Sequence, residues 1–392
     1  MACLLDWLDH PEKDFFPVLI AGTKGKGSTG FFLESILCAS GIRTGFYSSP
    51  HLEDPRERIR LQGKMISKAM WAAGLEQIRG ALRGRKLPPG CGELTYFEIM
   101  TELAILTFQQ QGLRVGLFEI GMGGRLDATN CLDAQVALLT PIHYDHEAFL
   151  GSTLAKIAGE KAAIIRPAAS VVVSPQRPAA LRVIQTVLRR QKAQGYRIKP
   201  LQGLRPGLEG DHQAVNAAAA LQAAVILRDR FGFPVRTPAM RQGLAQQAWP
   251  GRLEAWAGSP AWLLDAAHNP SSTAALVRYL KQRTPKRHRL LIFGTARDKK
   301  SARMLQQLSD IFDEVILTRI PNPRSQALPV LLQQARTCFS RVYPAGDVRS
   351  AMALARAVAR PKTEVVATGS FYLVGEIRKA LRTAQKNKKA KE

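Results

Sequence analysis

The sequence lacks long apolar runs, paired cysteine motifs and a basic leader. No part of its 392 residues approaches the ~18 consecutive apolar residues of a membrane span. Its cysteines are odd in number, scattered, and form no Cys-x-x-Cys pair, which indicates free thiols in a reducing compartment. They are Cys3, Cys38, Cys91, Cys131 and Cys338. The first residues, Met1 to His10, are partly acidic, unlike the start of a signal peptide. We therefore expect a cytoplasmic protein with no membrane partner, acting as a monomer.

Acidic side chains are scarce beside basic ones. The chain has 31 Asp and Glu against 56 Lys and Arg, a net charge of +25. Such an excess is found in nucleic-acid-binding proteins. Here the basic residues are spread along the chain and do not gather on one aromatic-bearing segment, which favours a solvated basic surface that attracts small polyanions. We expect no nucleic-acid partner, and the end, Lys386 to Glu392, is predicted to be a frayed basic tail.

A glycine-rich loop near the start is the feature around which the chain is organised. Val18 to Ile20 predict a short buried strand, and apolar residues with helical spacing begin after Ser28. Gly22, Gly25 and Gly27 lie between them. Glycines allow backbone N–H groups to approach an anion at a helix N-terminus, and Lys26 adds a positive charge for a phosphate. The loop departs from the usual P-loop spacing, so a plain strand–helix turn stays open.

Strand and helix patterns alternate through most of the chain, and 46% of residues are hydrophobic. This alternation predicts an α/β protein with two doubly wound, mostly parallel sheets. One sheet belongs to a P-loop-like domain and the other to a smaller Rossmann-like domain. The break at Pro250-Gly251 suggests domains over residues 1–248 and 249–392.

Polar side chains stand at the ends of several predicted strands. Glu119 closes a buried strand and is followed by glycines, Ser49 follows the strand from Thr44, and Asp145-His146 follow the strand that ends at Leu139. In open α/β sheets such positions meet at one edge, where a carboxylate and a hydroxyl can bind Mg²⁺. A surface glutamate, a turn-starting serine and a polar turn are the ordinary alternatives.

An ordered set of stretches resembles the folylpolyglutamate synthase/dihydrofolate synthase family of Mur-ligase-like amide ligases. The matching stretches run in family order over nearly the whole chain: Ala21 to Ser28, Tyr47 to Leu52, Glu57 to Arg60, Thr95 to Glu98, Glu119 to Asn130, Asp145-His146, Glu160 to Ala162, His212-Gln213, Asn216, Trp249 to Glu254, Leu264 to Pro270, Phe293-Gly294, Asp298-Lys299 and Thr368 to Ser370. Each match is weak by itself, and the ordered set is specific.

The resemblance implies an enzyme that uses ATP to activate a carboxylate as an acyl phosphate and joins it to L-glutamate. Its implied substrates are dihydropteroate or a folate, glutamate and ATP, with Mg²⁺. Matching positions imply ATP contacts at Gly25, Lys26, Gly27, Ser28, Asn216, Arg252 and Asp265. They imply metal ligands at Ser49, Glu119 and His146 and catalytic roles for Lys26, Lys161 and His268. Lys161 matches a family lysine that becomes carbamylated; a helix-surface ion pair is its ordinary alternative.

For the acceptor, Thr95 and Asp127 match positions linked to pterin recognition, with a helix N-cap and a turn as their structural alternatives. This match favours dihydropteroate as an acceptor, alongside the extension of folates. A polyglutamylation-only enzyme, a related ligase with another carboxylate acceptor, and a non-catalytic nucleotide binder are the competing hypotheses. The chain departs from the family by a short segment before the first strand, by Lys24, and by His143-Tyr144.

Overall fold

The computed structural model describes residues 1–89, 92–203, 205–246, 249–283 and 288–389. The chain divides into two compact units. The first comprises Met1–His51, Pro55–Gly207 and His212–Gln247, and the second Leu52–Asp54, Leu208–Asp211 and Ala248–Glu392. The second unit thus takes up two short segments that a single boundary near residue 250 does not anticipate. Cys91, residue 248 at the expected boundary and the last residues of the basic tail lie outside the described residues.

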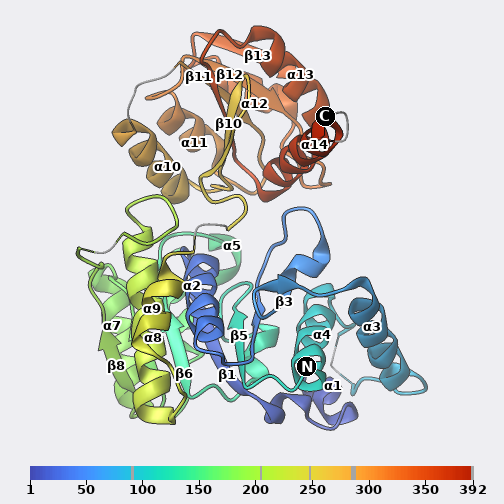
Figure 1. Ribbon diagram of the computed structural model, residues 1–392, viewed down its shortest axis with the longest axis vertical. Helices are drawn as coiled ribbons and strands as arrows, with labels where there is room; N and C mark the ends of the chain where they lie inside the picture. The colour runs from blue at the N-terminus through green and yellow to red at the C-terminus, as the bar shows by residue number, and fades with distance from the viewer. Residues whose placement is uncertain (90–91, 204, 247–248, 284–287, 390–392) are drawn as a thin grey trace. The chain divides into compact units, whose positions relative to one another are not determined.

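The first unit is built on a sheet of 8 strands in the order β4-β3-β2-β5-β1-β6-β7-β8 (Figure 1). The strands are β1 (Phe16–Ala21), β2 (Thr44–Tyr47), β3 (Ile59–Leu61), β4 (Lys64–Met65), β5 (Val115–Glu119), β6 (Val136–Leu139), β7 (Ser170–Val173) and β8 (Gln194–Arg197). All pairs from β2 to β8 are parallel, and β3 and β4 add an antiparallel edge. The central strand β1 is fully buried from Val18 to Ala21, as a sheet covered on both faces requires.

Helices cover both faces of this sheet. One face carries α2 (Lys26–Ala39), α8 (Gln213–Phe231) and α9 (Thr237–Leu244), which pack closely on one another. The other carries α3 (Lys68–Leu82), α4 (Tyr96–Gln110), α6 (Leu154–Ala162) and α7 (Pro178–Arg190). Their apolar side chains share one core with alternate residues of β1, such as Leu19 and Ala21. The period of two along the strand places the intervening residues on the opposite face.

The second unit contains a sheet of 6 strands in the order β13-β12-β11-β14-β10-β9. The strands are β9 (Glu254–Trp256), β10 (Ala261–Leu264), β11 (Arg289–Phe293), β12 (Glu314–Thr318), β13 (Arg341–Ala345) and β14 (Glu364–Thr368). Only β9 is antiparallel to its neighbour. Both sheets are therefore mostly parallel and covered on two faces, which confirms the predicted fold class.

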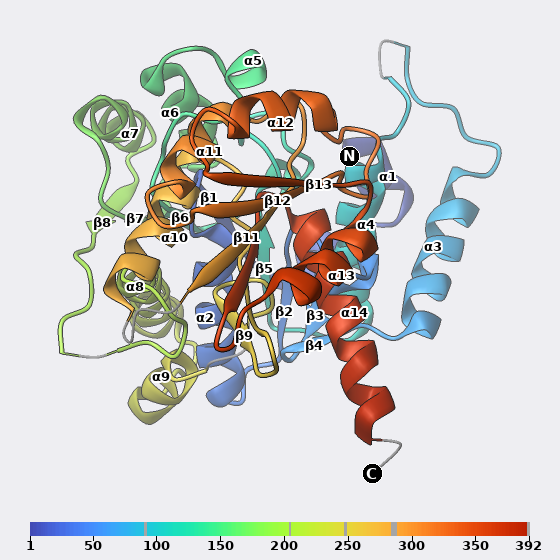
Figure 2. The same ribbon diagram turned by 90° about the horizontal axis from the view of Figure 1, so that it is seen from above.

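Two helix layers enclose the second sheet, and Figure 2 shows its strands fanned by their twist. The helices are α10 (Pro270–Gln282), α11 (Ser301–Leu308), α12 (Leu328–Ala335), α13 (Val348–Val358) and α14 (Phe371–Lys389). Leu291 and Phe293 of β11 pack in the core shared with α10, α11 and α12. Leu290 and Ile292 pack in the core shared with α13 and α14. This alternation explains why β11 is apolar at nearly every position.

Several short elements escape the sequence patterns. One of them is the edge strand β8, which ends at Arg197. This edge strand is largely exposed and polar and lacks an apolar signal. The two antiparallel strands β3 and β4, the strand β9, and the helices α1 (Ala2–Trp7) and α5 (Glu147–Leu150) are too short for a periodic pattern to appear.

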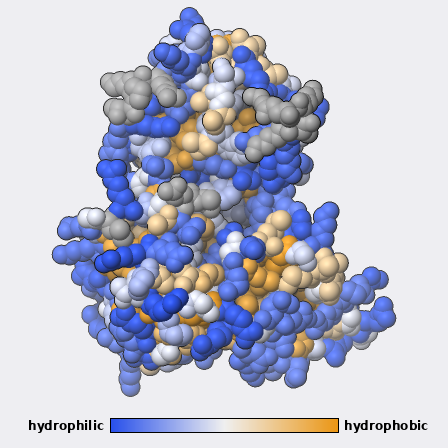
Figure 3. Space-filling model, viewed as in Figure 1, coloured by the Kyte–Doolittle hydropathy of each residue, from blue (hydrophilic) through white to orange (hydrophobic). Residues whose placement is uncertain are grey.

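Within the described residues, no helix is both long and apolar enough to cross a bilayer. The described cysteines, Cys3, Cys38, Cys131 and Cys338, are free thiols. Figure 3 shows mostly hydrophilic surface on the face in view, with smaller hydrophobic patches.

Candidate active site

The glycine loop forms the N-terminus of α2 in the first unit. Gly25 is the N-cap residue with φ 82, a left-handed conformation that favours glycine. Lys26 begins the helix, and Gly27 and Ser28 are buried in its first turn. A Cβ on Gly25 would lie 2.2 Å from Oδ1 of Asn216, so the side chain of α8 lies directly against the loop. The structure therefore brings Asn216 to the predicted phosphate loop, although the two are far apart in sequence.

The start of the same loop is fixed by β6. A Cβ on Gly22 would lie 1.9 Å from Oγ1 of Thr140, and the Thr140 hydroxyl donates to the Ala21 carbonyl at 3.1 Å. Only glycine fits at this position, where φ is 149. Thr23 continues the contact, since its hydroxyl donates to the His143 carbonyl at 3.1 Å and accepts from the His143 amide at 3.0 Å.

Glu119 joins the loop to the end of β2. Its Oε1 lies 3.7 Å from Nζ of Lys26, and its Oε2 accepts from the Ser49 amide at 3.3 Å. The Glu119 side chain is only 7% exposed, and Lys26 also donates to the Gly22 carbonyl at 3.3 Å. Three neighbouring strand ends thus supply one compact group in which Lys26 and Ser49 both contact Glu119.

The ligand atoms of Glu119 and Ser49 are of a type that can bind Mg²⁺. Glu119 and Ser49 supply a carboxylate and a hydroxyl, the hard oxygen ligands that Mg²⁺ prefers, and Mg²⁺ needs only one or two carboxylates beside substrate phosphates. No cluster of three His, Cys, Asp or Glu suited to a metal occurs in the part of the chain that the structure describes. The residues fit a cation shared with a phosphate rather than one held by an all-protein cage.

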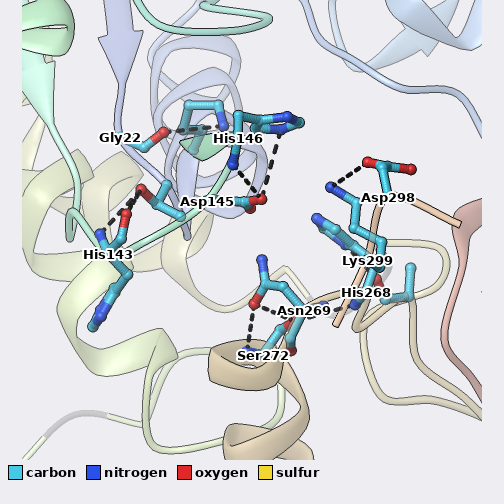
Figure 4. Close-up of polar contacts among 12 residues, drawn as sticks. Gly22, His143, Asp145, His146, His268, Asn269, Ser272, Asp298 and Lys299 are labelled. Atoms are coloured by element: carbon cyan, nitrogen blue, oxygen red, sulfur yellow. Dashed lines mark hydrogen bonds and ion pairs between the residues drawn. The ribbon is translucent and has the colours of Figure 1, made fainter. Parts of the chain in front are cut away.

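Asp145 and His146 follow β6 at the same edge of the sheet (Figure 4). The Asp145 Oδ1 accepts from the His146 amide at 3.0 Å and lies 3.8 Å from its Nε2. His146 has φ 51, a left-handed conformation that is uncommon among non-glycine residues. Figure 4 shows the His143 ring pointing away from this pair. Burial, with Lys24 and Arg177 nearby, lowers the pKa of His143 to about 4, so the ring is neutral at pH 7.

Lys161 lies in α6 and is only 5% exposed. Burial, reinforced by the charge of Lys26, lowers the pKa of Lys161 to about 7, and the carboxylates of Asp145 and Asp127 partly offset this. Lys161 therefore belongs to the same electrostatic site as the phosphate loop. The lowered pKa favours the neutral amine, which is the nucleophilic form of a lysine. A helix-surface ion pair does not describe it.

Thr95 and Asp127 have structural partners. The Thr95 hydroxyl caps α4 by accepting from the Glu98 amide at 3.2 Å, and Glu98 completes the capping box. The Asp127 carboxylate accepts from the Met122 amide at 2.9 Å and from the amide and hydroxyl of Thr129. Burial raises the pKa of Asp127, and these donors oppose the rise. Both structural alternatives, the helix cap at Thr95 and the turn at Asp127, are therefore present in the structure.

In the second unit, Arg252 sits in a tightly fixed turn. Gly251 and Leu253 on either side of it both have left-handed φ values, 69 and 50. The Gly251 amide donates to Glu254 Oε2 at 2.8 Å, and the Leu253 amide donates to Asp265 Oδ2 at 3.0 Å. A left-handed leucine is strained and persists only when its surroundings hold it. The turn therefore presents the Arg252 guanidinium in a set position, 4.8 Å from the Phe371 ring centroid.

Asp265 and His268 follow β10. Asp265 also accepts from the Ala267 amide at 3.0 Å; burial raises its pKa, against the lowering effect of Arg252. His268 Nδ1 lies 3.0 Å from the Ala266 carbonyl oxygen, which can only accept, so this nitrogen carries the proton. Figure 4 shows His268 beside Asn269, which caps α10 through Ser272. Arg252, Asp265 and Phe371 thus form one local group, with the His268 ring 5.3 Å from that of Phe371.

Three residues that support the site were not assigned a role from the sequence. Thr140 leaves no room for a side chain at Gly22, Gln213 accepts from the Asn216 side-chain amide at 2.8 Å, and Glu254 holds the Gly251 turn. Gln213 and Glu254 stand within stretches that resemble the family, which was the available signal. Thr140 gives no signal because its role depends on a contact between distant loops.

Comparison with known proteins agrees with the fold. The Mur ligase, glutamate ligase domain family matches residues 251–371. The dihydrofolate synthase/folylpolyglutamate synthase of Mycobacterium tuberculosis is 33% identical, over 96% of this chain and 88% of that protein. The Escherichia coli FolC structure in complex with DHPP and ADP is 32% identical with a TM-score of 0.86 and covers 98% of this chain and 92% of that one.

A third relative is the bifunctional folylpolyglutamate synthase/dihydrofolate synthase of Yersinia pestis complexed with AMPPNP and Mn ion, 32% identical with a TM-score of 0.82 over 97% of this chain and 92% of that one. The fold and the domain match define a ligase of the Mur type. Within that class, the chain belongs to the dihydrofolate synthase/folylpolyglutamate synthase family.

Proposed function

We propose that this enzyme is an ATP-dependent ligase that joins L-glutamate to dihydropteroate and extends (tetrahydro)folates. The observation that carries the proposal is the group formed by Lys26, Glu119 and Ser49 at the strand ends, in a chain of this family. The γ-phosphoryl group of ATP passes to the acceptor carboxylate, and ADP leaves. The glutamate amine then attacks the acyl carbon and releases phosphate and a proton.

The first unit binds the triphosphate in this proposal. Backbone N–H groups of Gly25, Gly27 and Ser28 face the phosphates at the positive end of α2, and Lys26 neutralises their charge. Asn216, which lies against Gly25, contacts the nucleotide from α8. Mg²⁺, held by Ser49, Glu119 and His146, would neutralise charge on the phosphates. Phosphoryl transfer depends chiefly on such positioning and charge neutralisation.

Lys161 is proposed to become carbamylated. A buried amine with a pKa of about 7 is neutral often enough to react with carbon dioxide at physiological pH. The carbamate would convert a cation into an anion beside Lys26. In ¹³C-bicarbonate, a carbamate NMR signal that disappears in Lys161→Met would support this; an identical spectrum for both proteins would contradict it.

The second unit supplies the remaining contacts. Its rigid turn presents Arg252 for bidentate binding of a phosphate, and Asp265 holds that turn while facing the nucleotide. His268 has Nδ1 occupied by a carbonyl, so Nε2 is the nitrogen able to take the proton that the glutamate ammonium must lose. Thr95 and Asp127 bind the acceptor in the first unit.

The test is ADP release by the purified protein with glutamate, Mg²⁺ and each acceptor in turn. We expect turnover with dihydropteroate and with tetrahydrofolate, and none when glutamate is omitted. Turnover with tetrahydrofolate alone would replace the proposal by a polyglutamylation-only enzyme. Turnover with neither acceptor would favour a ligase for another carboxylate acceptor or a non-catalytic nucleotide binder. An ATP-binding measurement and a filter-binding assay with DNA and RNA at physiological salt would distinguish these two alternatives.

The cellular setting follows from the same proposal. An enzyme of small-molecule substrates with free thiols is expected in the cytoplasm, with no membrane or nucleic-acid partner. We expect it to act as a monomer, which light scattering coupled to size exclusion would check; a dimer at working concentration would contradict this.

A further inference from the structure

The second unit holds a short segment that begins three residues after Ser49, one of the proposed metal ligands. Leu52, Glu53 and Asp54 belong to this unit, whereas Ser49 and His51 belong to the first. Leu52 packs against the turn and α14, since a Cβ on Gly251 would lie 3.0 Å from its side chain and one on Gly375 2.0 Å from its carbonyl oxygen. The backbone of Leu52 leaves no room for a side chain at Gly375, and its side chain is in tight contact with Gly251, so the segment packs closely on this unit.

An ion cluster fastens the same segment. Glu53 has a side chain that is only 4% exposed, and it accepts from Arg378 Nη1 and lies 2.7 Å from Arg382 Nη2. The Arg378 Nε in turn donates to both oxygens of Glu254, at 2.9 and 3.0 Å. Glu254 is the carboxylate that holds the Gly251 amide beside Arg252. One guanidinium therefore joins the segment that follows Ser49 to the turn that carries Arg252.

We propose that Arg378 is a positioning residue for the ATP–Mg²⁺ complex. Through Glu53 it restrains the chain leading back to Ser49, and through Glu254 it restrains the turn of Arg252. Three peptide units separate Ser49 from Leu52, a reach of at most about 11 Å. A displacement of the segment is thus transmitted to Ser49, whose amide contacts Glu119. This inference rests on the proposed function, because it takes Ser49 and Arg252 as contacts of the metal and the phosphates.

If Glu53 and Arg378 only stabilised the second unit, removing the charge of Glu53 would lower stability without affecting nucleotide binding. Glu314 provides a matched control for the effect on stability. Glu314 is a carboxylate of the same unit, 7% exposed in its side chain, that also pairs with two arginines, Arg341 and Arg360. It stands on β12, outside the segments 52–54 and 251–254. Removing the charge of Glu53 or Glu314 should cost the unit comparable stability, whereas only Glu53 is connected to the site.

The experiment compares Glu53→Gln and Glu314→Gln. We expect Glu53→Gln to weaken binding of Mg²⁺–AMPPNP, measured by calorimetry, by at least about tenfold, equivalent to ~1.4 kcal/mol. It should also raise the KM for ATP, leave the KM for the acceptor unchanged, and accelerate amide hydrogen exchange over residues 48–54. Glu314→Gln should lower thermal stability without these effects. Equal nucleotide affinity and equal exchange in the two variants would overturn the proposal.

Arg378→Lys keeps a charge between the two carboxylates but loses the planar fork that reaches both, so it guards against a variant that does not fold. It should weaken Mg²⁺–AMPPNP binding by at least about threefold, and wild-type affinity would overturn the proposal. The exchange measurement needs no ligand. The two proposals can therefore fail separately. If the wild type binds no Mg²⁺–AMPPNP, the proposed function is wrong. If Glu53→Gln still exchanges faster over residues 48–54 in that case, the restraint on this segment is nevertheless present.

Discussion

Nζ of Lys26 lies 3.7 Å from Oε1 of Glu119, so the proposed phosphate-binding lysine and the proposed metal-binding glutamate form an ion pair with each other. A magnesium-bound triphosphate carries a partner for each of them, a cation for the carboxylate and an anion for the ammonium. Binding would therefore exchange one protein contact for two ligand contacts. The pair also keeps both charges balanced in a largely buried site.

Lys26→Ala should reduce ligase turnover by at least ~10³, because charge stabilisation of the transferred phosphoryl group is lost. It should also lower the free energy of unfolding, because removing one partner of a largely buried ion pair leaves the Glu119 carboxylate without its compensating charge. Steady-state ADP release and thermal melting measure the two effects. Lys64→Ala, at an exposed position of β4, is the control. Near-wild-type turnover in Lys26→Ala would remove Lys26 from the site.

Glu119→Gln should weaken the dependence of turnover on Mg²⁺. The amide retains the shape of the side chain and its contact with the Ser49 amide, but it provides a poorer ligand and no charge for Lys26. The Mg²⁺ concentration at half-maximal rate should rise by at least about tenfold, with a melting temperature close to that of the wild type. Superimposable Mg²⁺ titrations of the two proteins would argue against a metal role.

Asp127→Ala should raise the KM for dihydropteroate by at least ~10-fold, with a smaller change for ATP, since a charge-assisted hydrogen bond is worth roughly 1.5–3 kcal/mol. The substitution also removes the acceptor for the Met122 and Thr129 amides. Asp127→Asn keeps one acceptor oxygen for this loop, so it separates the two effects. If Asp127→Asn binds dihydropteroate as the wild type does, the carboxylate serves only the loop.

Glu102→Gln tests a pH effect outside the active site. Glu102, in α4, is fully buried; burial, reinforced by Glu12, raises its pKa to about 8, and neither carboxyl oxygen has a hydrogen-bond partner among the described residues. The amino group of Met1 opposes the rise, and Cys131 also faces this carboxyl. The folded protein keeps a proton that the unfolded chain releases, so Glu102 makes stability fall as pH rises from 4.5 to about 8.

Urea unfolding at pH 5 and pH 7 measures this contribution. Between pH 5 and pH 7, the free energy of unfolding of the wild type should fall by about 1–2.5 kcal/mol more than that of Glu102→Gln. Lys161 acts in the opposite direction, because its lowered pKa makes stability rise only above about pH 7, so this window isolates Glu102. Parallel pH profiles for the two proteins would show that Glu102 is ionised in the folded state.

The fold class followed from the sequence because strands such as β1 and β11 are buried on both faces and read as apolar runs between amphipathic helices. The positions of Gly25, Lys26, Ser49 and Glu119 in one site followed from the rule that parallel strands end at one edge. The pairing of Lys26 with Glu119 did not, because side-chain contacts depend on distances that no spacing encodes. The use of Thr95 as a helix cap was predicted only as an alternative to substrate binding.

The seating of Leu52 to Asp54 on the second unit means that this unit is not a continuous piece of the chain. A fragment covering only 249–392 would leave the surfaces at Gly251 and Gly375 uncovered and deprive Arg378 and Arg382 of Glu53. Truncation studies and domain exchanges with relatives should therefore transfer the 52–54 segment together with the C-terminal portion. A chimaera must therefore take two separate stretches from the same relative, because residues 52–54 lie about 200 positions before the rest of the second unit.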